Sequence, residues 1–398
     1  MRAPSVHSIR ENTVKKVLYV ALVAALCSAA SAQAEVRFSG FGQFVVGQTN
    51  HAGERFAQVA ADDNNYDHDL NVERDSLVAV QMDADLGERI SATAQVLASG
   101  RKDFHPELAW AYLNAKLGNG FSAKVGRQRI PFYRYSDYLD VGQAYPWVRP
   151  PVAMYNQPWS NADMVNLSHN AYMGKWYSQA QAFVGRFDGE IYGHDSGVDA
   201  KLQKVRGASW EMEYDEWLSL RAAYVVGNVT VTGTALDQVT TALNAYGQGA
   251  RAERLDYSAD KGSFKSLGFR IDRADWLVIG EYAEFGVDDS VLDGVDRHDW
   301  YATVGHRFGA VMPHVTYGRR DAGIATAALA GLPTASPLYA PVAGAAASQQ
   351  LDESFRSVGV RWDVTDKVAL KADWTRYRSD VVGTADGDLL SAGVSFTF

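Results

Sequence analysis

The chain has 398 residues, a formal net charge of −9 at pH 7 and 47% hydrophobic residues. This length suffices for one large barrel or for two to three ordinary domains. The acidic balance argues against nucleic acid as a partner. The single cysteine, Cys27, cannot form a disulfide within the chain, which excludes a fold that depends on such bonds. Aromatic residues reach 12%, a share typical of either membrane-interface girdles or carbohydrate-binding surfaces.

The first 34 residues have the pattern of a secretory signal peptide. Two lysines precede an apolar run at 17–26, and small residues follow up to an A-x-A cleavage site that ends at Ala34. The apolar run is shorter than the roughly 18 residues that a spanning helix needs, which disfavours a permanent N-terminal anchor. We therefore expect a signal peptide at 1–34 and a mature domain at 35–398.

From Val36 onward, apolar and polar residues alternate in short segments, which is the period of a β-strand. The last segment is the clearest, because its apolar residues fall on even positions up to Phe398 and its small polar residues on odd positions. Such an apolar face is an aggregation hazard in a soluble protein, whereas a barrel surface in lipid requires it. No segment of the mature region shows a convincing helical period. The segments predicted as strands are 36–48, 76–86, 89–99, 106–117, 121–129, 162–169, 174–187, 205–214, 218–230, 264–272, 276–288, 298–308, 311–321, 354–363, 367–379 and 388–398.

The connections between these segments alternate between long and short. The short ones are tight turns such as Gly87-Glu88, and the long ones are 49–75, 100–105, 130–161, 188–204, 231–263, 289–297, 322–353 and 380–387. Tight turns at one end and loops at the other are typical of an up-and-down barrel, whereas a Greek-key sandwich does not sort its loops by length. We therefore expect an all-β, transmembrane, antiparallel barrel of sixteen strands, closed by pairing of the last strand with 36–48. The Ala-, Gly- and Pro-rich connection 322–353 is expected to be a mobile outer loop.

The opening strand Val36–Phe44, the closing residues Val394–Phe398 and the alternating loop lengths together resemble the Gram-negative outer-membrane general porin superfamily. The resemblance extends over the whole mature chain. It implies a sixteen-stranded trimeric barrel in the outer membrane, surrounded by lipid and lipopolysaccharide, that lets small hydrophilic solutes and ions diffuse passively. It also implies that no cofactor is bound and no reaction is catalysed. In this family the barrel-assembly machinery reads the terminal aromatic residues, here Phe396 and Phe398.

The resemblance further implies that the third outer loop, here 130–161, folds inward and narrows the pore. Its position and length fit, although the Pro-Glu-Phe-Gly-Gly motif of enteric porins is absent from it. The constriction residues are therefore predicted from charge alone, and they are Arg129, Arg134, Asp137, Asp140 and Arg149.

Charged residues on the strands are assigned to the lumen by alternation, with the apolar set taken as facing outward. Opposed charges across a narrow gap would create a transverse field that favours polar solutes. The alternative is that each charge lies near a strand end and is simply solvated, and an error of one residue would move a whole strand to the other face. The residues predicted to line the wall are Arg37, Lys124, Arg221, Arg307, Arg361, Lys371, Asp83 and Asp373.

Aromatic residues crowd the loop 130–161. Their faces suit stacking on sugar rings, which suggests a sugar-specific channel. The alternative is that the rings pack the loop against the wall or belong to an interface girdle. The residues concerned are Tyr133, Tyr135, Tyr138, Tyr145, Trp147, Tyr155 and Trp159.

No catalytic motif stands out, since the chain contains neither His-Glu-x-x-His nor Gly-x-Ser-x-Gly. The run 62–69 is rich in the oxygen ligands that Ca²⁺ prefers, but it lacks the spacing of an EF-hand, so a solvated acidic loop is favoured. Three further functions stay open: a channel specific for a sugar or an anion, an outer-membrane enzyme on a barrel scaffold, and a secreted carbohydrate-binding β-protein. The sorted loops and the terminal Phe398 disfavour the last of these.

Overall fold

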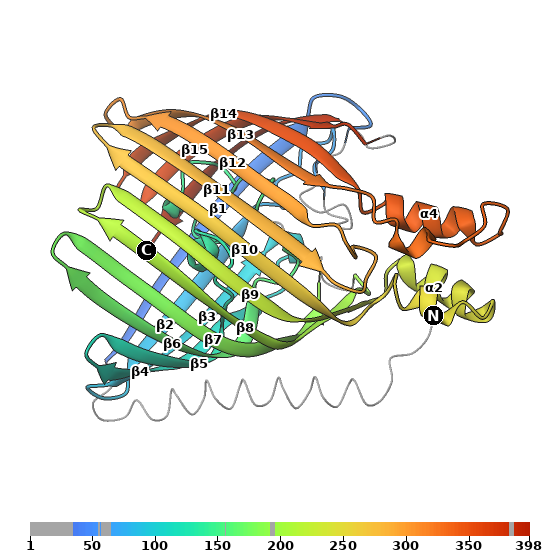
Figure 1. The fold of residues 1–398 in the computed structure, drawn as a ribbon. Helices are drawn as coiled ribbons and strands as arrows, with labels where there is room; N and C mark the ends of the chain where they lie inside the picture. The colour runs from blue at the N-terminus through green and yellow to red at the C-terminus, as the bar shows by residue number, and fades with distance from the viewer. Residues whose placement is uncertain (1–34, 55, 57–64, 156, 192–195, 382–385) are drawn as a thin grey trace.

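The computed structural model describes residues 35–54, 56, 65–155, 157–191, 196–381 and 386–398, to which all structural statements refer. The predicted signal peptide and the first part of the acidic run 62–69 lie outside them. Sixteen antiparallel strands form a closed barrel, in which each strand pairs with its chain neighbours and β1 pairs with β16 (Figure 1). The strands are β1 (Val36–Thr49), β2 (Leu77–Asp85), β3 (Ile90–Ser99), β4 (Glu107–Gly118), β5 (Phe121–Arg129), β6 (Asn161–Met173), β7 (Trp176–Glu190), β8 (Asp199–Tyr214), β9 (Leu218–Thr232), β10 (Tyr257–Arg273), β11 (Trp276–Val287), β12 (Arg297–His306), β13 (Val311–Ala322), β14 (Leu351–Thr365), β15 (Val368–Ser379) and β16 (Gly387–Thr397).

Every segment predicted as a strand is a strand of this barrel, so the predicted all-β, sixteen-stranded, up-and-down architecture is confirmed. The largest boundary differences are in β8 and β10, which begin well before their predicted starts. Each of these strands contains a register shift near a residue with positive φ, Lys204 (51°) in β8 and Ala259 (67°) in β10. Because a bulge of this kind moves the alternation by one residue, a strict period of two cannot be followed through it.

The two faces of the barrel wall differ in polarity. Apolar side chains such as Val80, Leu113 and Leu267 are exposed on the outer face, while their strand neighbours point into the barrel. An apolar outer band flanked by aromatic residues is what a barrel in contact with lipid hydrocarbon requires. The exposed aromatic residues at the short-turn end of the barrel include Phe121, Trp276, Phe308 and Trp362 beside short turns and Phe398 at the end of the chain.

The seam between β1 and β16 closes the ring. The backbone of Phe398 exchanges two hydrogen bonds with that of Gly40, at 2.9 and 3.0 Å. A Cβ atom on Gly40 would collide with the Phe398 ring, and one on Gly42 would collide with the Phe396 ring. Phe396 also stacks on Phe44, with ring centroids 5.9 Å apart. The glycines of β1 therefore make room for the aromatic rings that end the chain.

The long connections contain short helices, so the prediction of a mature chain without helical segments is wrong. Helices α2 and α4 project together from one end of the barrel (Figure 1). Helices of about this length are marginal by themselves and depend on tertiary packing, which is why sequence periodicity does not reveal them. The helices are α2 (Leu236–Ala245), α3 (Gly249–Ala252) and α4 (Tyr339–Ala347), and the 3-10 turns are η1 (Gly100–Lys102), η2 (Ser136–Tyr138), η3 (Gly142–Ala144) and η4 (Ala327–Leu329).

Helices α2, α3 and α4 share a small apolar core, and we call them the helical lobe. Leu243 and Val342 are fully buried in this core, which lies apart from the barrel interior. Arg251 of α3 donates hydrogen bonds to two carbonyl oxygens beside η4, so the two connections are joined. The connection 322–353, expected to be a mobile loop, thus holds part of a packed lobe. No helix in the described part of the chain is long and apolar enough to span a membrane.

Candidate pore constriction

The connection 130–161, which we call the inner loop, crosses the interior of the barrel (Figure 1, teal to green). It leaves β5 and returns to β6, but its hydrogen bonds reach strands far along the ring. The carbonyl oxygen of Pro131 accepts from Arg221 on β9 at 3.1 Å, and Trp147 donates to Thr316 on β13 at 2.9 Å. These partners belong to the inward-facing sets of their strands, so the loop runs through the lumen.

Two cationic side chains, one on β14 and one on β15, hold the middle of the inner loop by hydrogen bonds. Lys371 is 4% exposed and donates to three loop carbonyl oxygens, of which those of Tyr145 and Trp147 lie at 2.7 and 2.9 Å. Arg361 donates to the carbonyl oxygens of Gln143 and Tyr145 at 2.8 and 2.9 Å. An ammonium group has three donors, so Lys371 is saturated by the loop. The structure therefore places both predicted wall residues under the loop, where they position it.

Asp373 holds the next part of the inner loop. One of its carboxylate oxygens accepts the backbone N–H of Val148 at 2.7 Å. Its other oxygen lies 3.5 Å from Nε2 of His314, and both side chains are buried. This predicted acidic wall residue thus also contacts the loop rather than open water.

The end of the inner loop is tied to the first long connection by a buried ion pair. Arg149 and Asp75 approach to 2.5 Å, and Asp75 also pairs with Arg101 at 3.2 Å. The hydroxyl of Tyr66 donates to the same carboxylate at 3.0 Å. Burial alone would raise the pKa of Asp75, but the positive charges of Arg149 and Arg101 hold that pKa well below its usual range. Asp75 was not among the predicted site residues.

Glu281 on β11 is a further attachment point that the sequence did not reveal. This buried carboxylate accepts the hydroxyl groups of Tyr155 and Tyr301, the latter at 2.6 Å, and the backbone N–H of Arg134 at 2.8 Å. The alternation over 276–288 is weak, because Glu281 and Glu284 fall on opposite faces of the strand. An acid at an inward position of an otherwise apolar strand is the signal that could have marked Glu281.

Arg134 and Arg221 share one carboxylate on the wall. Their guanidinium groups lie 3.4 and 3.5 Å from Glu211 of β8. Arg134 also donates to the hydroxyl of Ser219 at 2.9 Å. The charges of this cluster therefore compensate one another where the inner loop begins.

The remaining predicted loop charges differ in their surroundings. Arg129 pairs with Asp140 and donates to the hydroxyl of Ser160. Asp137, in η2, is half-buried, and no ion pair or hydrogen bond joins its carboxylate to a residue that the structure describes. Of the five predicted constriction charges, Asp137 is thus the one without a bonded partner in the part of the chain that the structure describes.

The other predicted wall cations lie away from the inner loop. Arg37 pairs with Asp85 at 2.9 Å, and Arg307 pairs with Asp272 at 2.5 and 2.8 Å, both at the short-turn end of the barrel. This placement fits the alternative of charges near strand ends. Lys124 is half-buried on the wall itself, with its ammonium group 5.1 Å from the centre of a tyrosine ring.

Most aromatic residues of the inner loop are enclosed by packing. Trp147, for example, meets Tyr301 of β12 edge to face, with ring centroids 5.6 Å apart. Tyr138 differs, because 56% of it is exposed. The hypothesis that these rings present open faces to a sugar is therefore wrong for the other six. They are Tyr133, Tyr135, Tyr145, Trp147, Tyr155 and Trp159, none more than 7% exposed.

The half of the ring from β2 to β8 presents a different surface to the lumen, and we call it the open wall. Many of its inward side chains are half-buried rather than covered by the loop. Asp83 there accepts hydrogen bonds from Gln81 at 2.8 Å and from Thr93 at 2.6 Å. The uncharged polar residues of the open wall include Gln81, Thr93, Gln95, Asn114, Ser122, Asn166, Ser168, Asn170, Gln179 and Gln181.

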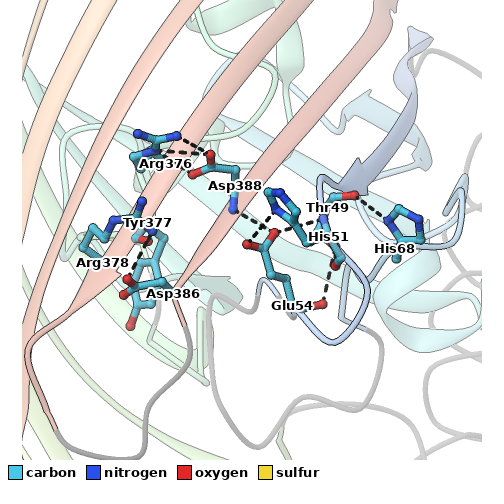
Figure 2. Close-up of polar contacts among 9 residues, drawn as sticks. All are labelled: Thr49, His51, Glu54, His68, Arg376, Tyr377, Arg378, Asp386 and Asp388. Atoms are coloured by element: carbon cyan, nitrogen blue, oxygen red, sulfur yellow. Dashed lines mark hydrogen bonds and ion pairs between the residues drawn. The ribbon is translucent and has the colours of Figure 1, made fainter.

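At the end of the barrel with the long connections, the first connection folds against the closing strands (Figure 2). Glu54 accepts the backbone N–H of Asp388 at 3.4 Å and lies 3.2 Å from Nδ1 of His51. Arg376 pairs with Asp388 at 2.6 Å. These contacts brace the rim over the seam. Among the described residues, which omit part of the run 62–69, no three His, Cys, Asp or Glu side chains are grouped to hold a metal ion.

Comparison with known proteins gives matches to solved structures alone, since no family model and no curated protein matches the chain. The outer membrane channel DcaP of Acinetobacter baumannii aligns with a TM-score of 0.58 at 12% identity, over 93% of this chain and 99% of that one. OmpF of Salmonella typhi, in a complex with daunomycin, aligns at 0.55 and 12% identity, over 91% and 97%. The trimer form of in-vitro folded OmpT from Vibrio cholerae aligns at 0.52 and 11% identity, over 92% and 100%.

Because the sequence identities are only 11–12%, these matches show that the chain shares its fold with the three proteins. The neighbours are sixteen-stranded outer-membrane porins, which confirms the resemblance at that level. The apolar outer face and the aromatic residues beside the short turns independently indicate a barrel in lipid. The chain therefore has the closed, sixteen-stranded fold of the porins of the Gram-negative outer membrane.

Proposed function

We propose that the protein is an outer-membrane porin whose water-filled channel lets small hydrophilic solutes and ions diffuse passively. One observation carries the proposal: the inner loop covers one side of the lumen, while half-buried polar side chains line the open wall on the other. A hydrophilic lining of this kind supports aqueous permeation. DcaP, which shares the fold, is itself an outer membrane channel. Diffusion involves no chemical step, so the proposal assigns no catalytic residue.

Planar-bilayer recording of the purified protein tests this function. We expect stepwise increases in conductance that scale with the salt concentration. Cell fractionation provides a second test, in which the mature chain should appear with the outer membrane. A correctly folded protein that gives no conductance steps, or a chain found in the soluble periplasm, contradicts the proposal.

The charged residues have two roles in this proposal. Arg134, Arg361 and Lys371 position the inner loop, because their hydrogen bonds end on loop atoms or on wall groups beside the loop. Asp137 and Lys124 face the remaining channel, and their charges set its ion selectivity.

We further propose a homotrimer in contact with membrane lipid and lipopolysaccharide. A trimer form of OmpT, which shares the fold, supports the oligomeric state. The exposed apolar residues of the outer face support the lipid contact. Light scattering in mild detergent should give three chains per particle, and a mass of one chain contradicts the trimer.

In this proposal, the two ends of the chain direct its export and its assembly in the outer membrane. Residues 1–34 direct export and are removed. The closing strand, with Phe396 and Phe398, is read by the barrel-assembly machinery. The pairing of Phe398 with Gly40 supports this role, since the same strand completes the ring.

A further inference from the structure

Four carboxamides on neighbouring strands of the open wall form a continuous patch. Asn170 of β6 lies opposite Gln179 of β7, which in turn lies opposite Glu211 of β8. Asn166 donates to Gln181 at 2.9 Å, one step along the same strands. Residues paired in this way on one face of a sheet are close neighbours. We call Asn166, Asn170, Gln179 and Gln181 the amide patch.

The amide patch has more hydrogen-bonding groups than the protein satisfies. The buried Oδ1 atoms of Asn166 and Asn170 have no hydrogen-bond partner among the described residues, and Asn166 is 6% exposed. Gln179 makes no side-chain hydrogen bond with a residue that the structure describes. The side chain of Gln179 is half-buried, so its carboxamide is open to hydrogen bonds with a solute in the lumen. Each carboxamide both donates and accepts, so the patch can match hydroxyl groups, which also do both.

One tyrosine lies beside the amide patch, and a second is exposed on the inner loop. Tyr177 precedes Gln179 by two residues on β7 and therefore shares its inward face. Tyr138 extends from the inner loop and is 56% exposed. The exposed ring of Tyr138 offers an apolar face to a solute in the channel.

The charges around the amide patch give anions no net attraction. Glu211 is compensated by the two arginines that share it. The carboxylates of Asp137 and Glu213 have no bonded partner among the described residues, whereas Lys124 lies over the ring of Tyr112. Lys116 lies opposite Ser122 on the same inward face as Lys124, so two ammonium groups stand against two carboxylates and leave no net charge that would hold an anion.

We propose that the amide patch, with Tyr177 beside it, is a binding subsite for uncharged, polyhydroxylated solutes such as sugars and polyols. The inference rests on the proposed channel function and names the class of solute that the channel retains. Each hydrogen bond with the patch replaces one with water, so binding is weak and release is fast. A bound solute then interrupts the ion current without closing the channel.

Bilayer recording with sucrose as the probe tests the subsite. Sucrose should reduce the wild-type current beyond its effect on viscosity, and gluconate, which adds a carboxylate to a polyol, should block more weakly. Gln179→Ala should raise the half-blocking sucrose concentration about three- to tenfold, the loss expected for one or two hydrogen bonds. Gln203→Ala is the matched control, because Gln203 is exposed on β8 opposite Asn228 and outside the patch, and it should leave the block unchanged.

A conservative variant guards against loss of folding in the alanine variant. Gln179→Glu keeps the side-chain size and an acceptor, so sucrose should still block it while gluconate blocks it less than the wild type. Conducting channels that sucrose does not block, or blocks equally in the wild type and Gln179→Ala, overturn the subsite and leave the channel function standing. Gluconate block of Gln179→Glu as strong as that of the wild type also overturns the subsite. A folded protein without conductance overturns both proposals.

Discussion

At the scale of single residues, most charged groups of the lumen hold the inner loop in place. Lys371 offers three donors to three carbonyl oxygens, and Asp373 accepts a loop N–H group. Arg149 and Asp75 form an ion pair in which both side chains are buried. Removing one partner from such a buried arrangement is costly, because the other is left without compensation.

Lys371→Met should loosen the inner loop. Each charge-assisted hydrogen bond that is not replaced should cost about 1.5–3 kcal/mol of unfolding free energy. Chemical denaturation in detergent measures this loss, and bilayer recording should show a noisier open channel. Lys124→Met is the matched control, because Lys124 does not bond to the loop and its loss should change ion selectivity only. Equal stability of the Lys371→Met variant and the wild type would contradict the role assigned to Lys371.

Asp75→Asn should destabilise the protein in a pH-dependent way. The folded-state pKa of Asp75 is lowered, so its ionised form stabilises the fold fully above the unfolded pKa of about 3.9 and less as the pH falls toward the folded pKa. The variant should therefore melt below the wild type at pH 7, and the difference should shrink below about pH 4. Melting curves at several pH values measure it, with the exposed Asp69→Asn as control. A difference that grows on acidification would refute the assignment.

At the scale of elements, the closing strand completes the barrel, and the inner loop determines which part of the wall faces the channel. Strand β16 brings two aromatic rings onto the glycines of β1, so shape as well as hydrogen bonding selects the seam. The inner loop is held mainly from β8, β9, β11, β13, β14 and β15, while many inward side chains of the open wall stay half-buried beside the channel.

Phe398→Ser should reduce the amount of folded barrel in the outer membrane more than it alters the conductance of channels that form. The residue completes the seam but lies on the outer face, away from the lumen. Immunoblotting of membrane fractions measures the yield, and single-channel recording measures the conductance. Phe308→Ser is a suitable control, since Phe308 is an exposed aromatic residue beside another short turn. Equal yields of the two variants would argue against a special role of the last residue.

At the scale of the whole molecule, the barrel and the helical lobe have separate apolar cores. The lobe joins connections that are distant in the sequence, through contacts among α2, α3 and α4. The inner loop, by contrast, shares one cluster with the barrel wall. The conducting part should therefore be independent of the lobe.

Replacing residues 334–348 by a short Gly-Ser linker should remove α4 and leave the barrel folded and conducting. The melting temperature should stay close to that of the wild type, because the deleted residues pack within the lobe. Calorimetry and bilayer recording measure the two properties. An inner-loop deletion of 142–147 is the contrasting control and should change both. A lobe deletion that abolishes folding would show that the two cores are coupled.

The sequence by itself determined the strand number, the order of the strands and the closing partner of the last strand. These features depend on local alternation and on loop length, and both are visible in a linear chain. The same local rules failed at the bulges of β8 and β10 and at the helices of the lobe. A bulge breaks the period of two, and a short helix depends on packing partners that lie far away in the sequence.

The tertiary structure alone decided which polar residues face open water. Alternation assigns Lys371 and Gln179 equally to the lumen, yet the inner loop covers the first and leaves the second half-buried. Glu281 and Asp75 became attachment points because the loop brings a tyrosine or an arginine to them across the barrel. The path of a loop through a closed barrel depends on contacts between residues far apart in the chain, and no local pattern in the sequence encodes those contacts.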